Sequence, residues 1–498
     1  MIKAGWLLSA AFCVTSSAFA AGHSVVVAEF TAPAAGWAME TDDAEILSRA
    51  GCVEPLTRIN FQGELEPLLA TEWKQVEPTV WEFKLRQGVT FQDGEPLNAS
   101  AVAGALTRLI KADAPPRAFS PKSITSVEAV GDDTVRITTP APSVLVPLRV
   151  SAPATGILAL SAFKDGKVNV KGTCTGPFEI TEEVPQQSIT LKANPKYWGG
   201  KVALDSAEVR FIIDGGVRAT LIRTGEAQIA VAIPVVVQQQ LKSVENVKLL
   251  TRDLPRTTSL YLNDSRPPFN NPKIRQAVQA AIDTSAIAGS LYEGVAQPAI
   301  GPFAPSEPWA PSDRSPVKPD PAKAKALLEE AGVQPGSLNL TILAYNERPE
   351  LPDLATIIQA QLGEIGIKVN VRAADYNSLE PDMLAGNFDM ALMSRSHLTD
   401  VADPAGFLEA DYTCKGGFNI SHMCDPAFDT EVEKAVAEPD PGKRFEIYKA
   451  LARRLTDDAD TVFIVHEQGA QAISTKVKNY QIHPLDHVML DKNVDIEN

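Results

Sequence analysis

Residues 79–99 read TVWEFKLRQGVTFQDGEPLNA and combine a strand, a turn and a helix start in one short stretch. Apolar and polar side chains alternate over residues 81–85, which predicts a strand with one buried face. The sequence QDG at 92–94 predicts a turn, because glycine accepts backbone angles that other residues avoid. Asn98 is placed to cap a helix over residues 99–110 by accepting a hydrogen bond from its first turn.

Strands and helices continue to alternate on both sides of this stretch. In the first half we predict strands over 24–28, 134–138, 188–192 and 208–213, and helices over 41–50 and 219–224. In the second half we predict helices over 273–282, 322–331 and 354–365, and strands over 338–344, 367–371 and 461–465. This spacing favours parallel strands joined by helical crossovers, and so an α/β fold. The proline-rich segment 298–321 is expected to be a surface connection, because proline cannot donate to a regular ladder.

The composition is that of a folded, soluble protein of several domains. The chain has 498 residues, of which 44% are hydrophobic and 22% charged, far from the composition of disorder. At roughly 150 residues for a typical domain, this length corresponds to about three units. The formal net charge of −16 repels phosphate backbones and anionic lipids, so we expect no nucleic-acid partner.

Residues 1–20 are predicted to be a secretory signal peptide that is removed by cleavage after residue 20. Lys3 supplies the positive start, residues 6–14 the apolar stretch, and Ala-Phe-Ala at 18–20 the cleavage site. The alternative is a membrane anchor. An anchor needs about 20 apolar residues, and Thr-Ser-Ser at 15–17 interrupts this run too early.

A lipid anchor on Cys13 is not expected. Phe12 precedes this cysteine, at a position where lipoprotein signals need a small side chain. We therefore expect a soluble periplasmic protein that is not a lipoprotein.

Removal of the leader leaves an even number of cysteines in an oxidising compartment: Cys52, Cys174, Cys414 and Cys424. Three pairings are possible. Cys414 and Cys424 bracket a Gly-Gly loop that a disulfide could close, and this pairing would leave Cys52 with Cys174. The alternative is metal binding, which is disfavoured because the sequence has no CxxC motif and no histidine at zinc-finger spacing.

Motifs of common hydrolases are absent from the sequence. It contains no Gly-x-Ser-x-Gly, no His-Glu-x-x-His and no phosphate-binding Gly-Lys-Ser/Thr. Residues 161–164 match Ser-x-x-Lys, but the companion motifs of that enzyme class are missing, so we interpret the match as a helix start. His483 and His487 are four residues apart with Pro484 between them, and we expect them in a solvated C-terminal segment. We therefore expect that the protein is not an enzyme. The alternative from a different functional class is a secreted hydrolase.

Several further segments occur in the order seen in one protein family: CTGPF at 174–178, NPKYWG at 194–199, NPKIRQAV at 271–278, DPAKAKALL at 320–328 and GEIGI at 363–367. Together with residues 79–99, they make the chain similar to family 5 of the periplasmic solute-binding proteins. This family serves the ATP-binding-cassette (ABC) importers of peptides and nickel.

The resemblance implies a class II periplasmic-binding-protein fold with two α/β lobes, a hinge and a small inserted domain. By similarity, lobe I takes residues 21–255 and 470–498, with the inserted domain near 65–172. Lobe II takes residues 256–469.

The resemblance also implies a function in transport. The expected protein is a receptor, monomeric and without a cofactor, that closes around short peptides or peptide-like solutes. It would deliver them to the inner-membrane permease and ATPase subunits of an ABC importer. The runner-up within the same class is a binder of a nickel chelate or other metal chelate.

Five residues are candidate solute contacts by this resemblance. Asp400, just before Asp-Pro, stands where relatives bind a peptide's amino group, and Arg348 where a guanidinium grips a carboxylate. Arg395 and His397 precede the Asp400 loop, and a neutral His397 suits nickel if the cargo is a metal chelate. Trp37 lies in a loop that borders the pocket in the family. The alternatives are a loop cap for Asp400, a surface position for Arg348, a packing role for His397 and a core position for Trp37.

Two cysteines stand where the family commonly has other residues. Cys174 replaces a glycine, and Cys52 lies near a position where an aromatic residue is common. The joint change favours a disulfide between them.

Overall fold

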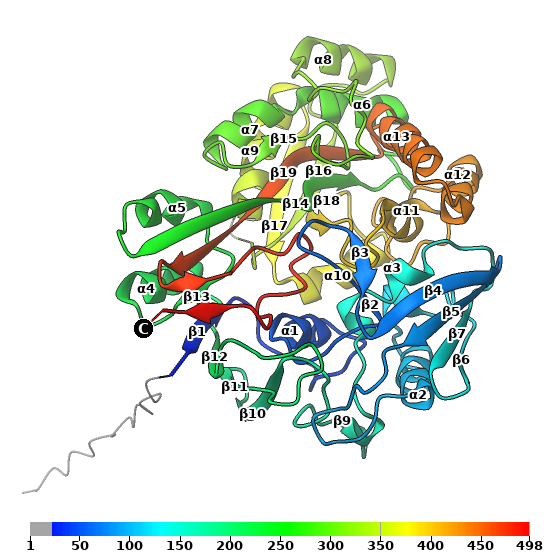
Figure 1. Ribbon diagram of the computed structural model, residues 1–498. Helices are drawn as coiled ribbons and strands as arrows, with labels where there is room; N and C mark the ends of the chain where they lie inside the picture. Colours follow the sequence, from blue (N-terminus) through cyan, green and yellow to red (C-terminus); the bar gives the residue numbers. More distant parts are fainter. Residues whose placement is uncertain (1–21, 349, 498) are drawn as a thin grey trace, which may run out of the picture.

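The structure is a computed structural model that describes residues 22–348 and 350–497. The predicted signal peptide lies outside the described residues. Figure 1 shows two bodies, each built of strands and helices, which are connected by two long strands. Among the described residues, no helix combines the length and the apolar character needed to cross a bilayer.

One large sheet runs through the whole molecule. Its strands follow the order β10 (Phe178–Val184), β11 (Ser188–Ala193), β12 (Ser206–Phe211), β1 (Ser24–Glu29), β13 (Ile229–Ala230), β19 (Thr461–Ser474), β14 (Val247–Leu262), β18 (Met390–Ser396), β16 (Asn339–Tyr345) and β17 (Lys368–Ala374), and β15 (Gln297–Pro298) pairs with β19. We call the body around β1 the first lobe and the body around β16 the second lobe.

The first lobe is built on the parallel strands β12, β1 and β13. Its helices are α1 (Asp43–Arg49), α3 (Val146–Arg149), α4 (Gly215–Thr224) and α5 (Val235–Lys242), and its short elements are β2 (Thr57–Ile59), β3 (Leu65–Pro67), η1 (Arg117–Phe119), η2 (Pro153–Thr155), η3 (Leu160–Ala162), β8 (Phe163–Lys164), β9 (Lys167–Val168), β20 (Val477–Lys478) and β21 (Asp495–Ile496). A separate sheet, β4 (Ala70–Glu77), β5 (Val80–Leu85), β7 (Thr134–Thr138) and β6 (Ser126–Val130), packs with α2 (Ala99–Ile110) against the same hydrophobic core.

The opening sequence stretch folds as predicted. Residues 80–85 form β5, and residues 99–110 form α2. The side chain of Asn98 accepts a hydrogen bond of 2.9 Å from the backbone N–H of Ala101. Gly94 adopts φ +92°, the left-handed conformation that this turn requires of a glycine.

The second lobe is built on β16, which is parallel to β17 and β18. Its helices are α6 (Pro272–Ala281), α7 (Thr284–Ser290), α8 (Pro321–Glu330), α9 (Glu350–Glu364), α10 (Tyr376–Leu384), α11 (Pro404–Tyr412), α12 (Pro426–Ala437) and α13 (Pro441–Asp457). The proline-rich segment 298–321 wraps on this lobe but is more than a surface connection. Phe303 in it is fully buried in the second core, because the segment covers apolar surface that the helices leave open.

Two long antiparallel strands, β14 and β19, connect the lobes (Figure 1). Their pairing is regular up to Asp253 and resumes at Thr257, so the ladder is interrupted between these residues. From Arg256 onward, β14 also pairs with β18 of the second lobe. The interruption thus separates the part of β14 that pairs with β19 alone from the part that also pairs with β18. β19 extends well beyond the predicted strand 461–465 because it continues across this junction into the first lobe.

Both predicted disulfides are present, Cys52–Cys174 with Cα atoms 5.4 Å apart and Cys414–Cys424 with Cα atoms 4.4 Å apart. The prediction for the two C-terminal histidines is wrong. His483 is 1% exposed and His487 is 6% exposed, because the tail folds back over the first lobe. There the hydroxyl of Ser48 donates a hydrogen bond of 2.8 Å to the carbonyl of His487.

Candidate functional site

Charged side chains gather where the carboxyl ends of parallel strands approach the junction of the lobes. Glu29 ends β1 in the first lobe, and Arg348 follows the end of β16 in the second lobe. Asp400 follows the end of β18. In α/β sheets, ligands bind outside the carboxyl ends of the strands. The junction is therefore the candidate site.

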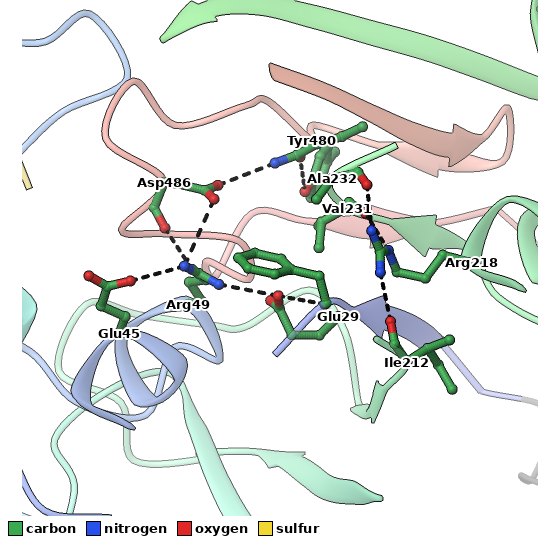
Figure 2. Close-up of polar contacts among 11 residues, drawn as sticks. Glu29, Glu45, Arg49, Ile212, Arg218, Val231, Ala232, Tyr480 and Asp486 are labelled. Carbon is green, nitrogen blue, oxygen red and sulfur yellow. Dashed lines mark hydrogen bonds and ion pairs between the residues drawn. The ribbon is translucent and has the colours of Figure 1, made fainter. Parts of the chain in front are cut away.

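In the first lobe this site contains an acidic cluster around Arg49 of α1 (Figure 2). Arg49 lies 3.2 Å from Glu29, 3.1 Å from Glu45 and 4.0 Å from Asp486. Burial raises the pKa of Glu29 and of Glu45, and Arg49 opposes this effect. One guanidinium serves three carboxylates here, and Oε2 of the buried Glu29 has no hydrogen-bond partner among the described residues.

Arg218 holds the neighbouring loops in place (Figure 2). Its guanidinium donates to the carbonyls of Ile212 at 2.7 Å and Val231 at 2.9 Å, and also to Ala232. These carbonyls follow the ends of β12 and β13, so one side chain fixes both loops at the edge of the site. Burial lowers the pKa of Arg218.

The junction strands contribute a second group of charges. Glu467 of β19 accepts from Arg348 at 3.0 Å and from the hydroxyl of Thr258 at 2.7 Å. Burial acts to raise the pKa of Glu467, but Arg348 and Arg256 outweigh it and lower the pKa. Glu467 is therefore ionised at neutral pH.

Arg256 of β14 is the cation of this group that lacks an acidic partner. Its guanidinium donates to the carbonyl of Ser394 at 2.9 Å, and within residues 22–348 and 350–497 no carboxylate lies at ion-pair distance from it. Burial lowers the pKa of Arg256 and Arg348 lowers it further, while Glu467 and, to a smaller extent, Glu45 of the first lobe raise it.

Asp400 lies between two guanidinium groups. Arg395 is 3.0 Å away and also binds both oxygens of Asp411, at 2.9 and 3.0 Å. Arg117, which comes from the first lobe, is 3.5 Å from Asp400 and stacks 4.2 Å from the ring centre of Phe418. Burial acts to raise the pKa of Asp400, but Arg395 and Arg117 together lower it.

Other contacts also bridge the lobes. Arg149 forms an ion pair of 2.9 Å with Glu409, and the backbone N–H of Val144 donates to the carbonyl of Val436 at 2.9 Å. The ion pair is partly exposed on the Glu409 side. With Arg117–Asp400, these contacts hold the lobes together in the present conformation.

The junction includes three of the five predicted contact residues, Asp400, Arg395 and Arg348. His397 is buried, with Nε2 2.7 Å from a carboxylate oxygen of Glu307 and its ring against Phe303. Trp37 lies in the first core, where its indole donates to Glu183 at 3.1 Å.

Sequence reasoning missed most of the charged residues at the junction, among them Glu45, Arg117, Arg256 and Glu467. A signal existed for two of them, because Arg256 and Glu467 fall within or next to the segments where similar proteins cross between lobes. Glu45 carried only a helix-dipole signal, and Arg117 carried none.

Within the described part of the chain, no group of three or more His, Cys, Asp or Glu side chains is arranged to hold a metal ion. His397 is the nearest histidine to Asp400 in sequence, and its Nε2 faces Glu307.

Comparison with known proteins identifies the family. The model for bacterial extracellular solute-binding proteins, family 5 Middle, matches residues 64–419, more than half of the chain. Di/tripeptide-binding protein 2 of Pseudomonas aeruginosa (strain UCBPP-PA14) is 28% identical over 450 residues, with 84% of each chain covered.

Solved structures share the whole architecture. The periplasmic binding protein DppA from Helicobacter pylori, in complex with the peptide STSA, has a TM-score of 0.81 at 26% identity and covers 96% of this chain and 99% of its own. A nickel ABC transporter protein from Bacillus halodurans has a TM-score of 0.77 at 26% identity, with 95% and 100% covered. The class II α/β fold expected from the sequence is confirmed, and the chain belongs to family 5 of the bacterial extracellular solute-binding proteins.

Proposed function

We propose that this protein is the extracytoplasmic receptor of an ABC importer and captures short peptides or peptide-like solutes between its lobes. One observation carries the proposal. The carboxylate of Asp400 and the guanidinium groups of Arg348 and Arg256 lie at the same edge of the second-lobe sheet, where Arg117 of the first lobe reaches Asp400. A peptide zwitterion has one cationic and one anionic end, and a site with both charges complements it.

In this proposal, binding works by closure. A solute held by one lobe stabilises the closed form only through contacts that it makes with the other lobe. The interruption of β14 and β19 between Asp253 and Thr257 supports bending at that point. The permease would then recognise the closed shape.

The candidate residues have distinct roles. Arg348, with Arg256, would bind the carboxylate of the solute, because both guanidinium groups retain unused donors. Asp400 would take the amino group, and an ammonium would compete with Arg117 for this carboxylate. Arg395 would hold Asp400 in place. Trp37 would act by packing within the first core, and His397 would support the site from behind, since both are buried.

The lobe boundaries inferred from the sequence are part of the proposal: lobe I over 21–255 and 470–498 with the inserted domain near 65–172, and lobe II over 256–469. The separate four-stranded sheet with α2 supports the inserted domain. We propose a periplasmic monomer that catalyses no reaction. The two disulfides support an oxidising compartment.

Isothermal titration calorimetry of residues 21–498 tests this function. Unmodified dipeptides and tripeptides are expected to bind, and the same peptides with a blocked N-terminus or an amidated C-terminus are expected to bind more weakly. Binding that ignores both blocked ends would contradict the charge assignment. Mass spectrometry of the recovered peptide checks the hydrolase alternative, for which cleavage products are required.

Nickel chelates are the second candidate. The likeness to the nickel protein of Bacillus halodurans favours them, as does the buried Nδ1 of His397, which has no partner among the described residues. A nickel–histidine complex in the same titration decides between the two. Tight binding of this complex without binding of any peptide would replace the peptide proposal.

A further inference from the structure

Exposed apolar side chains gather on the first lobe, on the loops and helix starts that follow β12 and β13. Ile213 is 82% exposed, Val236 is 68% exposed and Val217 is 47% exposed, and Ala232 is exposed as well. We call these four residues the apolar patch. Single exposed aliphatic side chains are ordinary on a protein surface, whereas a contiguous group of them marks a surface that makes an interaction.

Two contacts hold the patch together. Arg218 donates to the carbonyl of Ala232 (Figure 2) and, at 2.8 Å, to the carbonyl of Ile213, so one guanidinium ties both loops. A Cβ atom at Gly215 would collide with the ring of Pro234, so the start of α4 packs directly against the start of α5. The patch is therefore one fixed surface that two neighbouring loops build.

The patch and the ion pairs between the lobes lie on opposite sides of the long strands. α4 and α5 pack in a small core of their own, separate from the core around α1 and the four-stranded sheet. Figure 1 shows α4 and α5 on one side of β14 and β19, and α3, α11 and α12 on the other side. The pairs Arg117–Asp400 and Arg149–Glu409 belong to this other side.

A turn of the second lobe lies on the same edge of β19 as the patch. In the first lobe, the loop after β13 donates a backbone hydrogen bond of 2.9 Å to Ala470, and in the second lobe β15 pairs with His466. These two points of β19 are four residues apart, about 13 Å along a strand. The turn 290–297 leads from α7 into β15, and its Leu291 and Val295 are half-buried.

We propose that the apolar patch packs against the turn 290–297 when the lobes are open, and that this contact opposes closure. The inference rests on the closure that the proposed function requires, but not on the identity of the solute. A rotation about β14 and β19 that separates Arg117 from Asp400 brings the lobes together on the opposite side. The patch and the apolar side chains of the turn are then buried against each other, which stabilises the open form.

The contact also sets the affinity for the solute. Closure exposes the patch again, as in the present conformation, where Ile213 is 82% exposed. A solute that binds the closed form must therefore outweigh the loss of this contact, and its apparent affinity is lower by the same factor.

The variant that carries both Ile213→Asn and Val236→Asn tests the proposal, because an amide gains less from burial than an aliphatic group. Small-angle X-ray scattering of the solute-free mature protein measures the radius of gyration. The ratio of open to closed forms is expected to fall about tenfold, and the radius with it. Val184→Asn is the control, since that valine is 46% exposed on β10, away from the junction.

The same pair of asparagine changes is then added to the variant Arg117→Gln and Arg149→Gln, in which the cross-lobe ion pairs are lost and the open form gains population. A return of the radius towards the compact value supports the proposal. An expanded radius that the asparagine changes leave unaltered overturns it, while closure itself stands. A protein that shows no expansion without the ion pairs lacks the closure, and both proposals fail.

Sedimentation velocity checks a second copy of the chain as the occupant of the patch. The parent protein is expected to sediment as a monomer at every concentration. A dimer that the two asparagine changes dissociate would assign the patch to contact between copies and overturn the proposal.

Discussion

The carboxylate of Asp400 lies where the lobes touch, and its surroundings decide how it can act. Arg395 binds both Asp400 and Asp411, whereas Arg117 reaches Asp400 from the opposite lobe. In the proposed function, the same side chain would bind the solute and also take part in closure. The two contributions can be separated, because Glu409 joins the lobes through Arg149 at another point.

We predict that Asp400→Asn weakens dipeptide affinity by at least about tenfold, because a charge-assisted contact to the amino group is lost. Glu409→Gln removes the other cross-lobe ion pair, which also has one partly exposed partner, and is the control, with an expected loss of about two- to fivefold. Titration calorimetry measures both affinities. Equal losses in the two variants would show that Asp400 acts on closure alone.

Asp264 gives the stability of the second lobe a pH dependence. The pKa of Asp264 is raised to about 9. Burial is the main cause and Asp460 adds to it, while the charge of Arg275 opposes the rise. In the unfolded chain an aspartate ionises near pH 4. Between these values the folded form holds the extra proton, so stability is greatest below about pH 4 and falls as pH rises towards 9.

We therefore predict that Asp264→Asn flattens the decline of unfolding free energy between about pH 5 and about pH 8. Urea denaturation at several pH values measures this slope. Asp458→Asn is the control, because that side chain is half-exposed and pairs with Arg454, while only its backbone carbonyl accepts from Arg275. A slope that stays as steep in Asp264→Asn as in the parent protein would exclude Asp264 as its source.

At the scale of elements, the two disulfides differ in the length of the loop that each closes and in the part of the molecule that each holds. Cys52–Cys174 closes a long loop with a sequence separation of 122 and ties two segments of the first core together. Cys414–Cys424 closes a loop with a separation of 10. This short loop holds Phe418, on which Arg117 and Arg395 stack at 4.2 and 5.0 Å.

Replacement of Cys52 and Cys174 by serine is predicted to lower the unfolding free energy by about 5 kcal/mol, against about 3 kcal/mol for Cys414 and Cys424. Only the second pair of changes is expected to weaken solute binding, because it releases Phe418. Denaturant titrations and calorimetry measure the two effects. Non-reducing peptide mapping should recover both bonds, and free thiols at these positions would remove the basis for the prediction.

At the scale of the whole molecule, closure depends on contacts that exist only when the lobes meet. Arg117–Asp400 and Arg149–Glu409 are such contacts, and both have a partly exposed partner. Each is worth about 0.2–1 kcal/mol. Together they shift the balance between open and closed forms by about two-fold to about thirty-fold.

We predict that the double variant Arg117→Gln and Arg149→Gln has a larger radius of gyration without solute, because the open form gains population. Saturating peptide is expected to return it to the compact value, since solute contacts replace the lost pairs. Small-angle X-ray scattering measures both states. Arg372→Gln, which breaks an ion pair of 2.8 Å within the second lobe, should leave the radius unchanged. Equal radii with and without peptide in every form would rule out closure.

The sequence by itself determined the local structure and the family. The cap of α2 by Asn98 could be predicted because it needs only a contact with a residue three positions away. The order of the motifs from residues 79–99 to 363–367 identified the fold. The sequence also predicted the disulfide pairs that the structure shows: three pairings were possible, and the Gly-Gly loop between Cys414 and Cys424 favoured this one.

Only the tertiary structure decided which charges meet and which side chains are buried. Arg117 and Asp400 are far apart in the chain and carry no shared local pattern, and their contact results from the packing of two lobes. His483 and His487 were expected in solvent because the tail lacks a regular pattern, yet long-range hydrogen bonds to residues of the first lobe bury them. Local signals act over one helical turn or strand pair, whereas a site between lobes depends on contacts that only the complete fold makes.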